Sequence, residues 1–593
     1  MKKILITTGL LLHFIGGMAT TRSIQQARQI AESFVGSAIS LYARPNLARA
    51  KVSSLTTSRE SPEPYYIFNI EDSAGSSEPN GFVIVSSDDQ FQDILGYCPN
   101  GKFDENDMPD GLKCWLETLE REMAAAKAAD SNAKTRAYNT ESNENAQAPS
   151  GQPSIPPLIK TTWAQGEPFN NSIPVGSTVY PNGKASTCCV ATAMAQIMNY
   201  WQWPDYATGR HTNENHKSSF VYYGFVSYDW SKLNNHYGKY FDEDEGGKES
   251  YQEYTVEEAE EVAKLMYECG VATDTKWGNE SVASNISALK ALMTYYKYNK
   301  FMHAEARDVY SQREFRDILL NELNHGRPML YWAKNMSRTG HYFICDGFDT
   351  ETGMFHFNWG WSGHYDGYYA LSALTPHAAD GSTSNFGSFN YEQFVCVGCQ
   401  PEREGNYTPV FTAQKITLGN KVEYGYAVSV TLTNMTNSSV SFNGDIGIAL
   451  LQDGEIKYSK FDKTFDDLGS SEYFRAVTVP SMRLDSEIAE GTYIFCVIAQ
   501  NPSGEYSIIK ANYGTPYMWE MEFSPRNRSI QFTPITITDD IADAIEEKHP
   551  EPSIANTEYF TLSGAKVEYP QHGIFIRKTT YNDGTKKASK IAL

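Results

Sequence analysis

The segment STCCVATAMAQIMNY, from Ser186 to Tyr200, decides the fold of the central region. Its apolar residues recur every three or four positions, which predicts a helix with one buried face. Ser186 and Thr187 are natural N-cap residues, and Pro204 closes the run. Two cysteines therefore stand at the predicted helix start, where the helix dipole and free backbone N–H groups favour a thiolate. The residues of the predicted buried face are Val190, Ala193, Met194, Ile197 and Met198.

A thiolate is the form of cysteine that attacks a carbonyl carbon, so this helix start predicts a nucleophile. The alternative is a small buried apolar side chain, which is the commoner fate of a free cysteine. The position at a helix start leaves both interpretations open. The chain has 9 cysteines, an odd number too small for a disulfide framework in 593 residues, so at least one thiol is free or paired between molecules.

A thiolate nucleophile needs a base that can later protonate the leaving amine, and histidine suits this task at neutral pH. The best candidate lies in RTGHYFICDGF, from Arg338 to Phe348. Gly340 permits a close approach there, and His341 opens an apolar strand that can hold the ring. His341 follows Cys189 by about 150 residues, which is near the separation expected of papain-like enzymes.

Two further motifs supply polar groups for the same chemistry. In FHFNWGWSG, from Phe355 to Gly363, Asn358 could fix the imidazole tautomer and Trp359 could shield that bond from water. The alternative for this motif is a core aromatic strand with a glycine turn. In TWAQGEPFN, the side-chain amide of Gln165 and the backbone N–H of Cys189 could together hold an oxyanion.

The N-terminus, MKKILITTGLLLHFIGGMAT, has the pattern of an export signal. Two lysines precede an apolar run that is too short to span a bilayer, and small residues follow it. The alternative is a buried core helix. The sequence therefore predicts a signal peptide over residues 1–20 and a secreted or cell-surface protein, and no later stretch predicts a membrane span.

The composition of the rest of the chain indicates where its structural units begin and end, and which classes of partner it does not bind. Residues 136–156 are rich in Ala, Asn, Ser and Pro and read as an exposed linker. The predicted units around it are an α+β region over 21–135, an aromatic-rich α+β region over 157–402, a β-sandwich over 405–540 and a short β segment over 556–593. The net charge of −22 without a basic patch argues against nucleic-acid binding. Cys396 and Cys399 form a lone CxxC without a second pair, so we predict no metal and no cofactor.

Taken together, these motifs resemble the streptopain family of papain-like cysteine peptidases, including interpain-type enzymes. The resemblance rests on Trp163 and Gln165, CVATAMAQIMNY from Cys189, Gly340-His341 and Asn358-Trp359-Gly360-Trp361. GFVIVSSDD from Gly81 and Met108-Pro109-Asp110-Gly111-Leu112 resemble the inhibitory propeptide of that family. YFTLSGAKV from Tyr559 is similar to terminal β-domains that some secreted proteins use for export or surface attachment; the alternative is a β-domain without a sorting role.

The resemblance implies roles for particular residues. Cys189 would be the nucleophile, His341 the acid and base, and Gln165 part of the oxyanion hole, with Asn358 beside the histidine. The family usually has glycine directly before the nucleophile, and here that residue is Cys188. The residues implied to contact substrate or to shape its surroundings are Ser281, Gly340, Trp359 and Trp361.

The resulting hypothesis is a secreted cysteine endopeptidase made as a zymogen. Its substrates would be proteins or peptides, and its own propeptide would be an intramolecular inhibitor. Two alternatives remain at this stage. One is a catalytically inactive surface protein that binds its partner through the β-sandwich, and the other is an amidase or acyltransferase with the same catalytic atoms.

Overall fold

A computed structural model describes most of the chain. The predicted signal peptide and residues 136–151 of the predicted linker lie outside the described residues. The described residues are 21–41, 51–55, 64–71, 81–89, 91–99, 101–130, 152–174, 176, 180–241, 249–334, 340–371, 393–402, 409–419, 427–438, 442–453, 455–468, 473–483, 488–524, 526, 529–535, 554–561, 566–567, 574–581 and 586–592.

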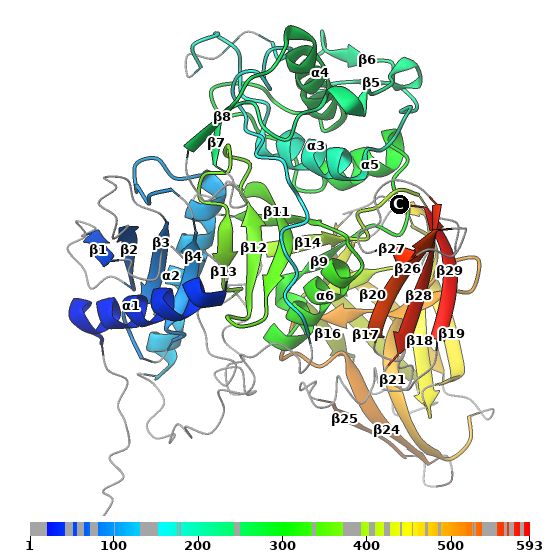
Figure 1. The fold of residues 1–593 in the computed structure, drawn as a ribbon. Coiled ribbons are helices and arrows are strands. Elements are labelled where there is room, and N and C mark those ends of the chain that lie inside the picture. Colours follow the sequence, from blue (N-terminus) through cyan, green and yellow to red (C-terminus); the bar gives the residue numbers. More distant parts are fainter. Residues whose placement is uncertain are drawn as a thin grey trace, which may run out of the picture.

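A ten-stranded sheet joins the first region to the central region (Figure 1). The strands of the first region continue the central sheet because β4 pairs with β13, with Tyr97 opposite Tyr368 and Gly96 opposite Tyr369. The small α+β region expected at the N-terminus is thus part of a larger sheet. In sheet order the strands are β1 (Lys51–Leu55), β2 (Tyr65–Glu71), β3 (Phe82–Ser86), β4 (Ile94–Cys98), β13 (Gly367–Tyr369), β12 (Met354–Asn358), β11 (Gly340–Asp349), β10 (Met329–Lys334), β14 (Gln393–Val397) and β9 (His303–Ala306).

Two helices of the first region pack on this sheet. Helix α1 (Ile24–Leu41) buries Ala27, Ala31 and Val35 against β2 and β3. Helix α2 (Asp110–Asp130) packs against β10 and β11 of the central region. The apolar residues of α2 recur at helical spacing, and burial of that face fixes its position on the sheet. They are Leu112, Leu116, Leu119 and Met123.

The central strands β10 and β11 separate two cores because alternate side chains point to opposite faces of a sheet. Tyr342 and Ile344 pack against α3 (Cys189–Trp201), α4 (Val256–Ala272) and α5 (Ser287–Tyr295). Phe343 and Cys345 pack against α2 and α6 (Gln312–Asn324) on the other face. Figure 1 shows α3, α4 and α5 gathered above the sheet.

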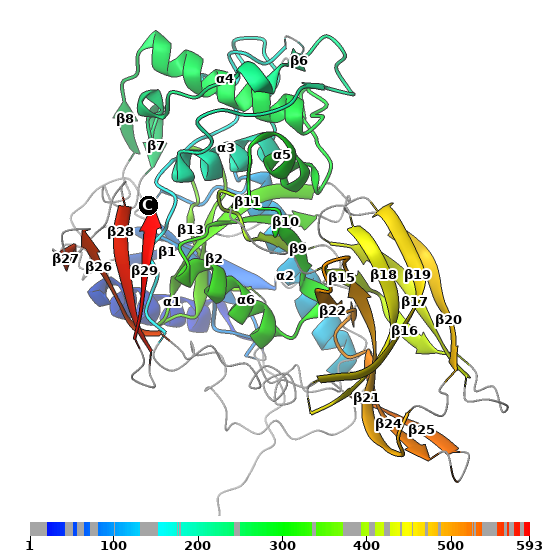
Figure 2. The same cartoon turned by 90° about the vertical axis from the view of Figure 1, so that its right-hand side faces the viewer.

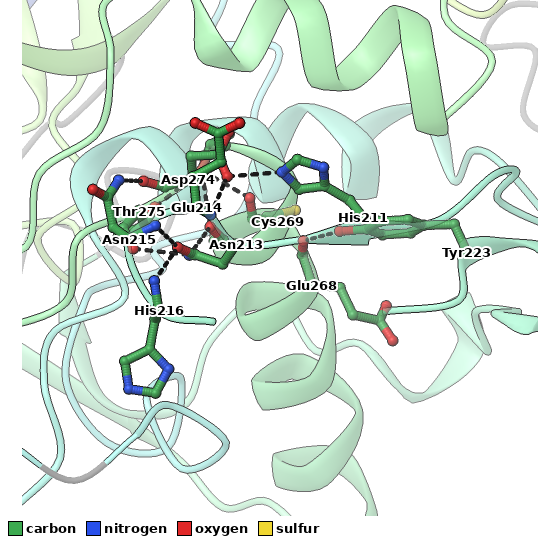
Figure 3. A network of polar contacts seen from close by, with 12 residues as sticks. His211, Asn213, Glu214, Asn215, His216, Tyr223, Glu268, Cys269, Asp274 and Thr275 are labelled. Atoms are coloured by element: carbon green, nitrogen blue, oxygen red, sulfur yellow. Dashed lines mark hydrogen bonds and ion pairs between the residues drawn. The ribbon is translucent and has the colours of Figure 1, made fainter. Parts of the chain in front are cut away.

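Short hairpins and a polar network complete the helical part. The hairpins are β5 (His211–Thr212) with β6 (Phe220–Val221), and β7 (Gly238–Phe241) with β8 (Glu249–Gln252). Asp274, which follows α4, bonds Nε2 of His211 at 2.8 Å and accepts from the backbone N–H of Glu214 at 2.7 Å (Figure 3). Tyr223 donates to the carbonyl of Glu268 within α4. The network anchors the first hairpin to the end of α4.

The C-terminal region contains two facing sheets with one core, which confirms the expected β-sandwich (Figure 2). One sheet has the order β16-β17-β15-β23 with β20 on β17, and the other has β19-β18-β21-β24-β25 with β22 on β21. The bounds are β15 (Phe411–Ala413), β16 (Lys415–Leu418), β17 (Ala427–Asn437), β18 (Phe442–Gln452), β19 (Glu455–Leu468), β20 (Tyr473–Arg483), β21 (Gly491–Gln500), β22 (Tyr506–Ile508), β23 (Lys510–Ala511), β24 (Met518–Ser524) and β25 (Ser529–Pro534).

The sandwich contacts the central region beside β9. The backbone N–H of Ala304 donates to Ser438 at 2.9 Å, and that of Tyr513 donates to Asp308 at 2.9 Å. Nζ of Lys510 lies 4.6 Å from the ring centroid of Tyr310, which adds a cation–π contact. A last sheet of four strands has the order β27-β26-β28-β29. Their bounds are β26 (Ile554–Thr561), β27 (Lys566–Val567), β28 (Ile574–Tyr581) and β29 (Lys586–Ala592).

Candidate active site

The cysteine pair lies at the start of α3, as the sequence predicts. The helix begins at Cys189, and Cys188 occupies the N-cap position without a side-chain capping bond. The expectation that Ser186 or Thr187 caps the helix is wrong. The chain turns one residue later, and the Thr187 hydroxyl bonds the hydroxyl of Thr192 at 2.8 Å instead.

Cys189 and His341 are in direct contact. The interaction between their side chains shifts the pKa of both groups, and the nearby backbone N–H of Tyr342 also lowers the pKa of Cys189. Residues two apart on a strand share a face, so His341 lies on the same face of β11 as Phe343, which is the face that α2 covers. Cys189 reaches the same place because α3 begins where β11 begins.

The two groups shift each other's pKa toward a thiolate–imidazolium pair. A hydrogen bond with Cys188 lowers the pKa of Cys189 most, burial opposes it, and the contact with His341 lowers it further. For His341, burial disfavours the proton, but the hydrogen bond and negative charge of Cys189 outweigh it and raise its pKa. The charges of Asp110 and Glu280 act in the same direction on the imidazole.

Gln165 lies close to the helix start. Its backbone carbonyl accepts from the N–H of Thr187 at 3.2 Å, two residues before Cys189. Its side chain is partly exposed, and no hydrogen bond found within the described parts of the chain uses its amide. The backbone of Gln165 therefore lies beside the segment that leads into α3, and the role of its side-chain amide in an oxyanion hole stays a prediction.

Asn358 is not brought to His341. It is 4% exposed and lies opposite Ile344 in the β11–β12 register, three positions along β11 from the histidine. Its Nδ2 donates to the Thr161 carbonyl at 3.0 Å, while its Oδ1 accepts from Gln196 Nε2 at 3.1 Å and from the Gly360 N–H at 3.0 Å. These contacts hold the segment before Gln165 against α3 and β12.

The four residues predicted to contact substrate or to shape its surroundings differ in their packing and exposure. Ser281 donates to the carbonyl of Ser186 at 2.9 Å, which ties its loop to the segment before the cysteines. Gly340 is packed so closely that a Cβ there would lie 1.8 Å from the ring of Trp332. Trp361 is partly exposed, whereas Trp359 is 4% exposed and donates through Nε1 to the Tyr365 carbonyl at 2.8 Å.

The start of α2 covers this site, a contact that the sequence reasoning missed. A Cβ on Gly111 would lie 2.8 Å from the Trp359 ring, and the charge of the preceding Asp110 acts on His341. One turn later, Cys114 interacts electrostatically with Cys189. The available signal was the motif Met108–Leu112, which contains Asp110 and resembles the inhibitory propeptide of the family.

No grouping of three or more His, Cys, Asp and Glu side chains could hold a metal ion within the described chain. All nine cysteines have free thiols, and Cys189 alone of them is partly exposed. A thiol at a helix start, paired with an imidazole at the beginning of a central strand, is the arrangement of papain-like cysteine peptidases. The fold and the site thus place the chain in that class.

Comparisons with known proteins identify the family. The model of the peptidase C10 family matches residues 163–369, and that of the Spi protease inhibitor matches residues 19–123. Streptopain of Streptococcus pyogenes is 30% identical over 355 residues, covering 57% of this chain and 80% of streptopain. The chain belongs to the peptidase C10 family. It is a cysteine-type peptidase with an N-terminal inhibitor domain, which is the organisation of a zymogen.

Two other relatives are similar over different lengths. Thiol protease/hemagglutinin PrtT of Porphyromonas gingivalis is 30% identical over 427 residues, which is 68% of this chain. The chain spans 44% of the length of that relative. The structure of a prointerpain A fragment of Prevotella intermedia is 26% identical with a TM-score of 0.46, and the match covers 60% of this chain and all of the fragment.

Proposed function

We propose that the chain is a secreted cysteine endopeptidase in which Cys189 is the nucleophile and His341 the general acid and base. The observation that carries the proposal is the interaction of the two side chains at the start of α3, which lowers the pKa of Cys189 and raises that of His341. These directions favour a proton on the imidazole and a negative charge on the sulfur. A thiolate can then attack without first losing a proton.

The proposed reaction has two stages. The sulfur of Cys189 attacks the peptide carbonyl carbon, and the oxyanion accepts hydrogen bonds from the Cys189 backbone N–H and the Gln165 amide. The C–N bond breaks as His341 gives its proton to the leaving amine, which leaves a thioester. Water then attacks the thioester, His341 accepts a proton from it, and the carboxylic acid leaves as the thiolate reforms.

The first region would inhibit this site by covering it. The start of α2 lies on Trp359, and Asp110 presents a negative charge to His341, where substrate would have to bind. Cys189 and His341 already interact in the full chain. Inhibition would therefore act by occlusion, and cleavage in the 136–156 linker would allow the first region to leave.

Export is supported by the N-terminal sequence alone. The lysine pair and short apolar run match a signal peptide, and within the described residues no helix has the length and hydropathy needed to cross a bilayer. N-terminal sequencing of protein recovered from the culture medium would test the signal cleavage and the linker cleavage together. A mature terminus inside the 1–20 run contradicts the predicted boundary.

The catalytic proposal is tested with the purified chain, cleaved in the linker by an added protease that is then inactivated. Wild type is expected to hydrolyse casein, whereas Cys189→Ala and His341→Ala are expected to lose this activity. Mass spectrometry of products from a peptide library separates peptide hydrolysis from acyl transfer. An inert cleaved wild type, or an active Cys189→Ala variant, contradicts the proposal.

A further inference from the structure

Gln196 is a buried amide on the helix that carries Cys189. It follows Cys189 by seven residues, which is close to two helical turns, so both residues lie on the same side of α3, about 10 Å apart along its axis. Gln196 is 1% exposed, and the rest of the buried run from Val190 to Met198 is apolar apart from Thr192. A buried amide costs free energy unless its polar atoms have partners. The partners of Gln196 therefore indicate why a polar residue stands in this core.

These partners lie on the segment that leads to Gln165 and on β12. Oε1 of Gln196 accepts from Oγ1 of Thr161 at 2.7 Å and, over a longer 3.4 Å, from the backbone N–H of Trp163. Nε2 of Gln196 donates to Oδ1 of Asn358 at 3.1 Å. Asn358 in turn donates to the Thr161 carbonyl at 3.0 Å. The helix, the segment and β12 thus meet at one amide.

The same segment is attached to the helix start at its other end. The carbonyl of Gln165 accepts from the N–H of Thr187 at 3.2 Å, and Trp163 stands two residues before Gln165. Gln165 is therefore held between two attachments to the unit that carries Cys189. The separation of the two proposed oxyanion donors, the Gln165 amide and the Cys189 N–H, has to be kept, because a displacement of about 1 Å can cost about 100-fold in rate.

We propose that Gln196 is a positioning residue, which ties the segment from Thr161 to Gln165 to α3 and so holds the Gln165 amide at the oxyanion site beside Cys189. The inference rests on the proposed function, because it gives Gln196 a role in that reaction. Gln196 would act through Gln165 and not on the substrate. The alternative is a buried amide that only stabilises the core, which predicts lower stability without a specific effect on catalysis.

The test is a double-mutant cycle between Gln196 and Gln165 in the linker-cleaved enzyme. Gln196→Met keeps the length and the helix preference of the side chain but removes its polar atoms. Gln165→Ala removes the amide that the segment carries. Wild type, the two single variants and the double variant are compared by kcat and KM for a fluorogenic peptide, with Cys189→Ala as the background.

Gln196→Met is expected to lower kcat by at least about 10-fold and to change KM little, because the position of an oxyanion donor matters mainly in the transition state. Gln165→Ala should lower kcat by about 100-fold or more. In the Gln165→Ala background, Gln196→Met should lower kcat by less than about two-fold, since its effect is exerted through the missing amide. Equal losses from Gln196→Met in both backgrounds, no loss in either, or a fully active Gln165→Ala variant overturns the inference.

Asn213→Ala is the matched control for lost stability. Asn213 is another fully buried amide, whose Nδ2 donates to the Thr275 carbonyl at 2.9 Å and whose Oδ1 accepts from the N–H of Asn215 at 2.9 Å (Figure 3). These contacts lie in the first hairpin and beyond the end of α4. Asn213→Ala should lower the unfolding temperature, as Gln196→Met does, yet keep the wild-type kcat. A fall in kcat as large as that of Gln196→Met would show that lost stability alone lowers activity, and would overturn the inference.

Alkylation by iodoacetamide, with mass spectrometry of the labelled peptide, reports on Cys189 separately. Gln196→Met should be alkylated at Cys189 at the wild-type rate, because this reaction forms no oxyanion. An alkylation rate that falls as far as kcat would place the defect at the nucleophile and overturn the inference. Thr161→Val removes one of the same hydrogen bonds with little change in volume, so it replaces Gln196→Met in the cycle if that variant does not fold.

The background variant separates this inference from the proposed function. Peptide hydrolysis that survives in Cys189→Ala overturns the proposed function and this inference with it. Hydrolysis that needs Cys189, together with an additive cycle, overturns the role of Gln196 alone. Hydrolysis that needs Cys189, together with a non-additive cycle, supports both.

Discussion

Gly111→Ala is expected to weaken inhibition without altering the mature enzyme. The new Cβ would lie 2.8 Å from Cε3 of Trp359, 3.3 Å from its Cζ3 and 3.4 Å from Cδ1 of Phe343. The indole has little freedom to move, because its Nε1 bonds the Tyr365 carbonyl and its ring lies against Phe343 at 4.7 Å between centroids. The first region must therefore shift away from the site.

Forcing a methyl group into a packed contact costs about 1–3 kcal/mol. That range corresponds to roughly a 5- to 150-fold larger population of the uncovered site. Gly36→Ala is the matched control, because Gly36 lies in helix α1 of the same region and a Cβ there meets no atom within 4 Å. Both changes add the same intrinsic helix preference for alanine over glycine.

The assay is the initial hydrolysis of a fluorogenic peptide by the intact chain, followed by the rate at which the linker is cut. Gly111→Ala should raise both by at least several-fold over wild type and Gly36→Ala. After complete cleavage all three proteins should have equal activity, which also shows that the variants folded. Equal initial activity in Gly111→Ala and Gly36→Ala would refute the reasoning that α2 closes the site.

Three further predictions concern the site and its support. Asn358→Ala should lower the free energy of unfolding by about 2–4 kcal/mol, because buried hydrogen bonds are lost. The pH profile of casein hydrolysis should stay unchanged. A shift of either limb of that profile would indicate a bond between Asn358 and His341. The dependence of activity on pH should be bell-shaped. Activity should fall in acid as Cys189 is protonated below its lowered pKa, and in alkali as His341 is deprotonated above its raised pKa. A profile with a single limb would contradict the ion pair. Burial raises the pKa of Glu268 to about 7 from 4.5, so its stabilising neutral form is fully present below 4.5 and is lost as the pH rises through 7. Glu268→Gln should therefore raise the free energy of unfolding by up to about 3 kcal/mol at about pH 8, seen as a higher urea midpoint, and leave both unchanged near pH 4. Equal effects at the two pH values would contradict this.

Local patterns predicted the secondary structure around the site. The three-to-four-residue spacing from Val190 to Met198 identified α3, whose face is buried because all of these residues meet one core. The apolar run after His341 identified β11 for a similar reason. The N-cap was missed because the helix begins one residue later than the spacing suggests, directly after Cys188, and the Thr187 hydroxyl bonds Thr192 instead.

The role expected for Asn358 depended on strand register. An asparagine shortly after the histidine can orient the imidazole only if the two strands bring the side chains opposite each other. Here Asn358 pairs with Ile344, about 10 Å along β11 from His341 at the usual rise per strand residue. Its amide is consequently used by Thr161, Gln196 and Gly360 instead.

The sequence by itself determined the chemistry: a cysteine at a helix start, a histidine opening an apolar strand, and family motifs in the right order. These are local features, because helix and strand periods and the reactivity of a thiol at a helix start depend on neighbours in the chain. Only the tertiary structure decided that β4 extends the central sheet, that α2 lies over Trp359, and that Cys188, with a φ of 84°, has a conformation suited to glycine. Such contacts join residues far apart in sequence or depend on one backbone angle, and both are fixed only when the whole core packs.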